Sequence, residues 1–328
     1  MTISMNNIKT LFFGSTSDSV IVLTKLYHLA SRIYKLQISA VVTQPPHPVG
    51  RRGVLTPTPV ETWARKHTIP VLSFPTNTEK PWLYENKQTV IDALQPFKAD
   101  LLVSASYGQK ISAETIQSAK YGGLNIHPSI LPRWRGGDPV PWAILAGDHQ
   151  IGVSVVTLAE KFDEGKILAQ KKIPLPPDAL PDPLRTELFT IGADLLAENL
   201  PSLLDHPNRS SQKLSTIHYP LSTPAPPYAR RFTRDDGFEP WETITDAMTT
   251  GKDTNRLERK LRALTPWPGM WTKVECKMQN VKCKMIEGKR LKILSCHISR
   301  ITSLLELDSV QLEGKKPVPF VQFQKAYW

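Results

Sequence analysis

In the N-terminal part of the chain, short apolar runs alternate with segments whose apolar side chains recur every three or four positions. The short runs are typical of buried strands, and the wider spacing is typical of helices that cover a sheet. Strands are expected at residues 8–13, 36–42, 70–72, 99–105, 123–127, 151–158 and 166–173. Helices are expected at residues 17–31, 60–67, 84–94, 113–119, 141–146 and 184–204. This β-α-β order predicts an α/β fold, in which a mostly parallel sheet carries helices on both faces.

The pattern changes near Asp205. Residues 206–240 are rich in serine, threonine and proline and show little periodicity, so we expect an extended linker. Beyond it, a helix and then three short alternating runs are expected at residues 243–264, 272–278, 281–286 and 290–296. In the second of these runs, the apolar residues would face inward while Lys282 and Lys284 face outward. The pattern therefore predicts a small β-barrel of OB-type architecture with a basic outer face.

The length of 328 residues suits two domains. We expect an N-terminal α/β domain at residues 1–205, the linker at residues 206–240, and the C-terminal barrel domain at residues 241–328.

Charge is distributed unevenly along the chain. The formal net charge is +11, and residues 256–300 hold 12 lysines and arginines against 3 acidic residues. Such a concentration of positive charge indicates a module that meets a polyanion. A merely solvated basic surface is the alternative.

Several classes of protein are excluded by features that the sequence lacks. It has no apolar run long enough to span a membrane, and its beginning has no secretory signal pattern, so we expect a cytoplasmic protein. The three cysteines, Cys276, Cys283 and Cys296, form no CxxC pair and stand in no cluster with zinc-ligand spacing. We therefore expect neither a disulfide scaffold nor a metal site.

Polar residues of catalytic type gather at the predicted strand 123–127. Asn125 and His127 are two positions apart, so their side chains share one face at the carboxyl end of the strand, where open sheets bind ligands. An amide and an imidazole together can donate hydrogen bonds to an acyl oxygen. The following loop, residues 129–137, holds two prolines and two glycines and should be rigid.

An acidic residue follows the next predicted strand. Asp163 could return to the same pocket, orient His127 and take a proton from an attacking amine. Each of the three residues also has a purely structural interpretation: a buried strand histidine, a turn-forming aspartate and an amide that caps a strand end.

The segment Asn125-Ile-His-Pro-Ser-Ile-Leu-Pro-Arg-Trp-Arg-Gly136, together with Asp163-Glu-Gly165, resembles the signature of the folate-dependent formyltransferase family. The resemblance implies a Rossmann-like N-terminal domain and transfer of a formyl group from 10-formyltetrahydrofolate to a primary amine, with no metal. It implies that the catalytic residues are Asn125, His127 and Asp163. It implies that folate is bound by Tyr107, Gly108, Ser129, Ile130, Leu131 and Pro132.

Other segments are similar to the members of that family that formylate initiator methionyl-tRNA. They are the loop at residues 42–59, the Arg-Ala-Leu-Thr-Pro-Trp-Pro segment that begins at Arg262, and the Gly-Lys-Lys-Pro segment at residues 314–317. The resemblance implies a monomer that contacts tRNA through its basic residues. The candidates for this contact are Arg51, Arg52, Lys282, Lys284, Lys289, Arg290 and Lys292.

Four alternatives remain open, and one of them, a purine-pathway formyltransferase, would normally lack the second domain. A formyltransferase acting on a sugar-nucleotide amine would share both domains, although the basic C-terminal stretch favours tRNA. A non-catalytic RNA-binding protein on the same scaffold would not need Asn125, His127 and Asp163. A dinucleotide-dependent dehydrogenase would carry GxGxxG after its first strand, where this chain has Gly14-Ser-Thr-Ser-Asp18.

Overall fold

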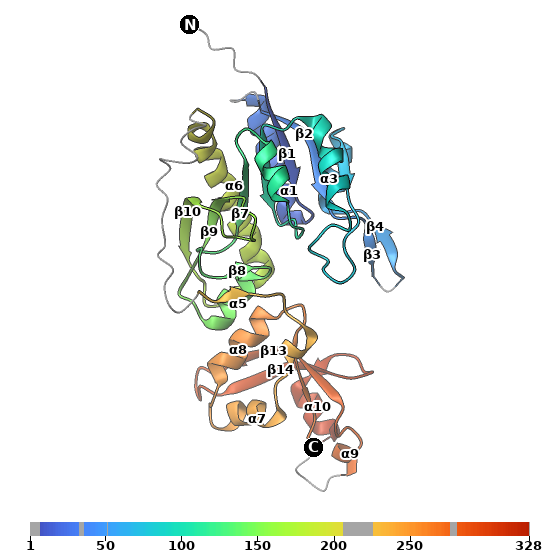
Figure 1. Cartoon of the computed structure of the whole chain (residues 1–328). Helices are drawn as coiled ribbons and strands as arrows, with labels where there is room; N and C mark the ends of the chain where they lie inside the picture. The colour runs from blue at the N-terminus through green and yellow to red at the C-terminus, as the bar shows by residue number, and fades with distance from the viewer. Residues whose placement is uncertain (1–6, 33–35, 51, 206–225, 276–280, 328) are drawn as a thin grey trace. The chain divides into compact units, whose positions relative to one another are not determined.

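The computed structural model describes residues 7–32, 36–50, 52–205, 226–275 and 281–327 (Figure 1). Within these ranges, no helix is both long enough and apolar enough to cross a membrane. The chain divides into two compact units that interleave along the sequence. The first comprises Met1–Gly137, Ile151–Ile173 and Arg185–Ala229, and the second comprises Asp138–Gln150, Pro174–Leu184 and Arg230–Trp328. The domain boundaries at residues 205 and 240 stay a prediction.

The first unit is built on a seven-stranded sheet in the order β10-β9-β7-β6-β1-β2-β5 (Figure 1). Its strands are β1 (Ile8–Phe13), β2 (Leu36–Thr43), β5 (Val71–Ser73), β6 (Leu101–Ala105), β7 (Gly123–His127), β9 (Gln150–Thr157) and β10 (Ile167–Pro174). Strands β7, β6, β1, β2 and β5 run parallel to one another. Strand β9 runs antiparallel to β7. The predicted α/β fold is therefore confirmed.

The helices of this unit lie close to their predicted positions. They are α1 (Ser17–Arg32), α2 (Pro59–Lys66), α3 (Lys87–Leu94), α4 (Ala113–Ser118) and α6 (Pro181–Asp205). Helix α3 begins later than predicted because the Asn86 side chain accepts a hydrogen bond from Thr89 N at 3.1 Å, which caps the first turn. The core includes Leu11, Phe13 and Leu102, from two central strands that are buried on both faces.

Short strands complete this unit. The loop predicted before α2 contains a hairpin of β3 (His47–Val49) and β4 (Val54–Thr56), and β8 (Arg135–Gly136) pairs in parallel with β11 (Tyr228–Ala229). Gly50 and Gly53 turn the hairpin with φ of 72° and 59°, a conformation that glycine adopts without strain.

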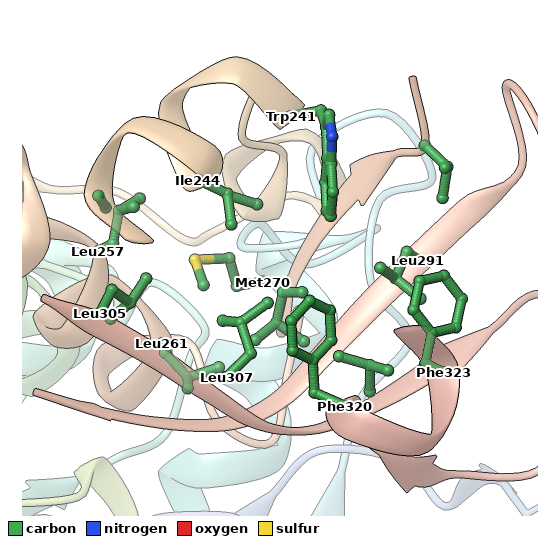
Figure 2. Packing of buried hydrophobic residues seen from close by; sticks show 14 of the residues in the cluster. Trp241, Ile244, Leu257, Leu261, Met270, Leu291, Leu305, Leu307, Phe320 and Phe323 are labelled. Carbon is green, nitrogen blue, oxygen red and sulfur yellow. The ribbon is translucent and has the colours of Figure 1, made fainter. Parts of the chain in front are cut away.

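The second unit has a four-stranded antiparallel sheet, packed against helices. The strands, in sheet order, are β12 (Met270–Lys273), β13 (Arg290–Ile298), β14 (Leu305–Leu312) and β15 (Val318–Pro319). The helices are α5 (Pro139–Ala146), α7 (Trp241–Thr249), α8 (Thr254–Ala263), α9 (Val281–Lys284) and α10 (Phe320–Tyr327). Figure 2 shows the core between them, where Met270 and Leu291 from the sheet meet Trp241, Leu257 and Phe320 from the helices.

Two sequence predictions are wrong in this unit. The helix expected at residues 243–264 is broken into α7 and α8, since Gly251 and Asp253 take left-handed conformations with φ of 79° and 61°. The strand expected at residues 281–286 is the short helix α9, so Lys282 and Lys284 do not lie on a sheet face. The predicted turn at residues 279–280 lies outside the described residues. Cys283 is disulfide-bonded, which the cysteine spacing did not predict, and Cys296 is a free thiol.

Candidate active site

The carboxyl ends of β6 and β7 form one edge of the sheet, because Ser104 pairs with Asn125 in parallel register and Ala105 with Ile126. Asn125 and His127 stand two residues apart at the end of β7, with His127 buried and Asn125 half-buried. The sequence pattern places the two side chains on one face of the sheet.

Asp163 lies beside both of them. It occupies the connection between β9 and β10 in a left-handed conformation, with φ of 55°, and its side chain is only 9% exposed. Its Oδ1 accepts a hydrogen bond from Asn125 Nδ2 at 3.3 Å and lies 3.5 Å from His127 Nδ1. Its Oδ2 accepts from Gly136 N at 3.0 Å. The chain thus brings the three predicted catalytic side chains together, and their catalytic role stays a prediction.

The imidazole of His127 faces an oxygen at each nitrogen. Nε2 lies 3.0 Å from the backbone oxygen of Trp134, and Nδ1 faces the Asp163 carboxylate. A neutral imidazole carries one N–H, whereas an imidazolium carries two. The doubly protonated ring therefore fits both neighbours.

Gly136, which donates to Asp163, lies too close to its neighbours on β11 to carry a side chain. Its φ is 116°, and a Cβ there would lie 2.6 Å from Ala229 O and 2.8 Å from the Tyr228 ring. Gly165 is equally constrained, because a Cβ would lie 1.6 Å from Thr157 O. These two glycines let the loops that carry and hold Asp163 pack against neighbouring backbone.

The loop after β7 is anchored by a buried hydroxyl that sequence reasoning missed. Ser154 is fully buried on β9, and its Oγ donates to Ser129 O at 2.7 Å and accepts from Leu131 N at 3.2 Å. Gln170 on β10 donates from Nε2 to Ser154 Oγ at 2.8 Å and to Leu131 O at 3.1 Å. A lone serine in an otherwise apolar strand was the available signal.

Ser154→Ala should lower the free energy of unfolding by about 1–3 kcal/mol, because it leaves Ser129 O and Leu131 N buried without that partner. The same loop should become less ordered, which raises KM for a ligand that it contacts. Urea titration and steady-state kinetics measure the two effects. Thr10→Val is the matched control, since Thr10 is also fully buried but its Oγ1 has no hydrogen-bond partner in the described structure. If both variants unfold at the wild-type midpoint, Ser154 is not an anchor.

The predicted folate residues lie around this edge. Ser129 and Leu131 are buried; the Leu131 side chain packs with Val156 and Ile167, and its backbone N–H and C=O are hydrogen-bonded to Ser154 and Gln170. Ile130 and Pro132 are half-buried. Their role in folate binding stays a prediction.

Tyr107 and Gly108 follow β6, and the Tyr107 hydroxyl lies 2.9 Å from that of Tyr84. Burial raises the pKa of Tyr84 to about 12 and that of Tyr107 well above its ordinary value, so both stay protonated at neutral pH. The next residue, Gln109, is 2% exposed, and neither atom of its amide has a hydrogen-bond partner within the described ranges. Sequence reasoning did not select Gln109, because nothing in its sequence neighbourhood marks an unpaired amide.

The predicted tRNA contacts are spread over both units. Arg52 is exposed on the β3–β4 hairpin, and Arg51 lies outside the described residues. Lys284 and Lys289 are exposed near α9, and the Lys282 side chain is not described. Arg290 is exposed and Lys292 half-buried on β13. Their contact with tRNA stays a prediction.

Across the described ranges of the chain, no group of three or more histidine, cysteine or acidic side chains could hold a metal ion.

Comparison with known proteins identifies relatives along nearly the whole chain. The formyl transferase family matches residues 8–199. A methionyl-tRNA formyltransferase from Roseiflexus sp. (strain RS-1) is 32% identical, in an alignment that covers 97% of this chain and 92% of the relative. A methionyl-tRNA formyltransferase from Listeria monocytogenes serotype 4a (strain HCC23) is 34% identical over 81% of this chain and 76% of its own.

Solved structures share the fold. A 4-N formyltransferase from Francisella tularensis has a TM-score of 0.57 at 16% identity and covers 82% of this chain and 94% of its own. HypX from Aquifex aeolicus in complex with tetrahydrofolic acid has a TM-score of 0.52 at 15% identity and covers 98% of this chain and 48% of its own. The candidate residues therefore lie on a fold that formyltransferases use.

Proposed function

The chain belongs to the formyl transferase family, and we propose that it transfers the formyl group of 10-formyltetrahydrofolate to the free amino group of initiator methionyl-tRNA. The observation that carries the proposal is the convergence of Asn125, His127 and Asp163 at the carboxyl edge of the sheet. Similarity to methionyl-tRNA formyltransferases over almost the full length supports the substrate.

Asp163 accepts the proton that the amine loses as its nitrogen attacks the formyl carbon. A carbon–nitrogen bond to the methionyl group forms, a tetrahedral oxyanion develops, and the bond from the formyl carbon to the folate nitrogen breaks. That folate nitrogen then takes up a proton, so the numbers of atoms and charges balance. Gly136 N and Asn125 Nδ2 hold the Asp163 carboxylate in place beside His127, where it can meet the attacking amine.

Asn125 and His127 stabilise the oxyanion. The Asn125 amide has two N–H groups, of which one is given to Asp163, so the second is free for the oxyanion. The positive charge of a protonated His127 adds electrostatic stabilisation in a largely buried site. One such donor is typically worth about 3–4 kcal/mol in the transition state.

The second unit supplies the positive charge that a tRNA requires. Residues 256–300 carry 12 lysines and arginines against 3 acidic residues, and neutralising phosphates with them makes affinity depend on salt. The protein acts as a cytoplasmic monomer in this proposal.

The test is formylation with purified components. The protein is mixed with 10-formyltetrahydrofolate and either initiator or elongator methionyl-tRNA, and formylmethionine is measured after deacylation. We expect product with both tRNAs and a preference for the initiator. Folate binding without formylation of either tRNA contradicts the proposal and points to an amino sugar nucleotide as the acceptor.

A further inference from the structure

The outer face of β12 and β13, in the second unit, carries a cluster of aromatic and basic side chains. Met270 on β12 and Leu291 on β13 point into the core of the second unit (Figure 2). The alternate positions of the two strands are the outer ones, which pair as Trp271 with Lys292 and Lys273 with Arg290. One tryptophan and three cations therefore share a single sheet face, which we call the β12–β13 outer face.

The aromatic and cationic groups of this face touch one another. The Arg290 guanidinium lies 4.7 Å from the centroid of the Trp271 ring, and the Phe238 ring lies 4.9 Å from it. Trp271 Nε1 donates to Arg234 O at 3.0 Å, which fixes the indole. The Trp271 ring is thus held in place, with Arg290 over it and Phe238 beside it.

A second tryptophan, Trp267, precedes β12 by three residues and has a largely exposed side chain. Trp267 is 60% exposed, and Phe238 is 38% exposed. The backbone between Trp267 and Trp271 lies next to a cation, because a Cβ on Gly269 would lie 2.7 Å from Lys292 Cε and 3.3 Å from its Nζ. An exposed aromatic ring on a segment whose backbone lies next to a lysine is a combination that single-stranded nucleic-acid sites use.

Nearby carboxylates do not cancel the positive charge. Glu239 Oε1 forms ion pairs with Arg256 Nη1 at 2.6 Å and with Lys260 Nζ at 2.7 Å. Glu313 accepts from the backbone N–H of Arg290 at 3.3 Å, which leaves the guanidinium of that arginine on the ring. Asp235, three residues before Phe238, and Glu275, two residues after Lys273, are exposed acidic neighbours along the chain. Because residues 256–300 hold 12 lysines and arginines against 3 acidic residues, the stretch that contains Lys273, Arg290 and Lys292 keeps a net positive charge.

We propose that the β12–β13 outer face, with Trp267, binds an unpaired segment of the RNA substrate, a base stacking on Trp267 and the adjacent phosphates lying against Lys273, Arg290 and Lys292. The inference rests on the proposed function for the identity of the RNA. Aromatic rings stack on any base whose face is accessible, and lysine and arginine neutralise the backbone between bases. In a duplex the base faces are covered by their neighbours, so this combination selects unpaired nucleotides over paired ones.

Binding of a labelled short oligoadenylate, and of an RNA duplex of equal length, tests the proposal in the full-length protein. Trp267→Ala should weaken oligoadenylate binding by about tenfold and leave duplex binding within about twofold. Trp267→Phe should recover most of the loss. Trp82→Ala is the matched control, because Trp82 is 46% exposed in the other unit, and should change neither affinity.

The salt dependence separates stacking from charge. Trp267→Ala should leave the slope of log affinity against log salt unchanged, whereas Arg290→Gln or Lys273→Gln should each flatten it by about 0.7 for a single strand. Equal losses for oligoadenylate and duplex, or wild-type binding by Trp267→Ala, would overturn the proposal. A bound protein partner whose association Trp267→Ala abolishes, with oligoadenylate binding intact, would overturn it as well.

Its failure is distinguishable from failure of the proposed function. If the protein formylates methionyl-tRNA but binds oligoadenylate and duplex equally, only this inference is wrong. If the protein binds oligoadenylate through Trp267 but formylates no tRNA, only the proposed function is wrong.

Discussion

Asp163→Asn should lower kcat for formyl transfer by about 10²–10⁴-fold, the range typical of a lost general base. Asparagine keeps the size of the side chain, and its amide oxygen can still accept from Gly136 N, but it cannot take a proton from the amine. It also removes the negative charge that faces His127. Single-turnover kinetics with saturating tRNA measure the chemical step directly.

Binding of tRNA should be unaffected by this substitution, because Asp163 is largely buried and carries no positive charge. Glu164→Gln is the control: Glu164 is the adjacent acid, its side chain is 42% exposed, and its cationic neighbours, Arg135 and Lys161, are both 3.8 Å away. It should turn over at close to the wild-type rate. A kcat for Asp163→Asn within a few-fold of wild type would show that another group takes the proton.

Glu239→Gln should be the most destabilising of the substitutions considered, at about 3–5 kcal/mol, because it removes one partner from a buried ion cluster. Glu239 is 5% exposed and accepts from Arg256 at 2.6 and 3.1 Å and from Lys260 at 2.7 Å. Lys260 is itself buried, and its Nζ also donates to Phe238 O at 2.6 Å. The glutamine amide oxygen can still accept a hydrogen bond, but the charges of Lys260 and Arg256 lose their counter-ion.

The pH dependence of this effect has a definite sign. Burial acts to raise the pKa of Glu239, but the hydrogen bonds from Arg256 and Lys260 outweigh it and hold the pKa below its ordinary value of 4.5. A carboxyl group whose pKa is lowered by folding stabilises the fold above its unfolded pKa and loses that contribution as the pH falls. The difference between wild type and Glu239→Gln should therefore be full near neutral pH and shrink below about pH 4.5.

Hydrogen exchange of the α8 amides, which reports on the second unit alone, measures the difference. Glu242→Gln is the control, because Glu242 is exposed on the first turn of α7. Equal protection in all three proteins at neutral pH would mean that the cluster contributes nothing to stability.

The sheet of the first unit could be predicted because its strands are buried on both faces, so their runs are continuously apolar. Residues 11–13 and 101–103 are examples. Position along the strand at residues 123–127 also predicted that Asn125 and His127 share a face. Asp163 could be placed near them only as a hypothesis, since its approach depends on Gly136 and on a left-handed backbone, which are tertiary features.

The second unit was harder because its elements are short. Val281, Cys283 and Met285 alternate as a strand would, yet a four-residue helix forms there. The break between α7 and α8 had a visible signal in Gly251, which a strong helical pattern on both sides concealed. The partners of Ser154 could not be predicted, because they lie on the loop after β7 and on β10, which only the folded sheet brings together.

The interleaving of the two units sets the order in which the protein can be completed during synthesis. Helix α5 belongs to the second unit, where it packs on α8, and Gly147 at its end approaches the Arg259 guanidinium. Val140, Ala143 and Ile144 of α5 are buried in the finished protein. Roughly a hundred residues separate α5 from α8, so at ribosomal speeds α5 emerges roughly 5–20 s before its partner helix exists. During that interval a nascent chain displays an apolar helix that chaperones can recognise, and a gene truncated before α8 would leave it exposed permanently.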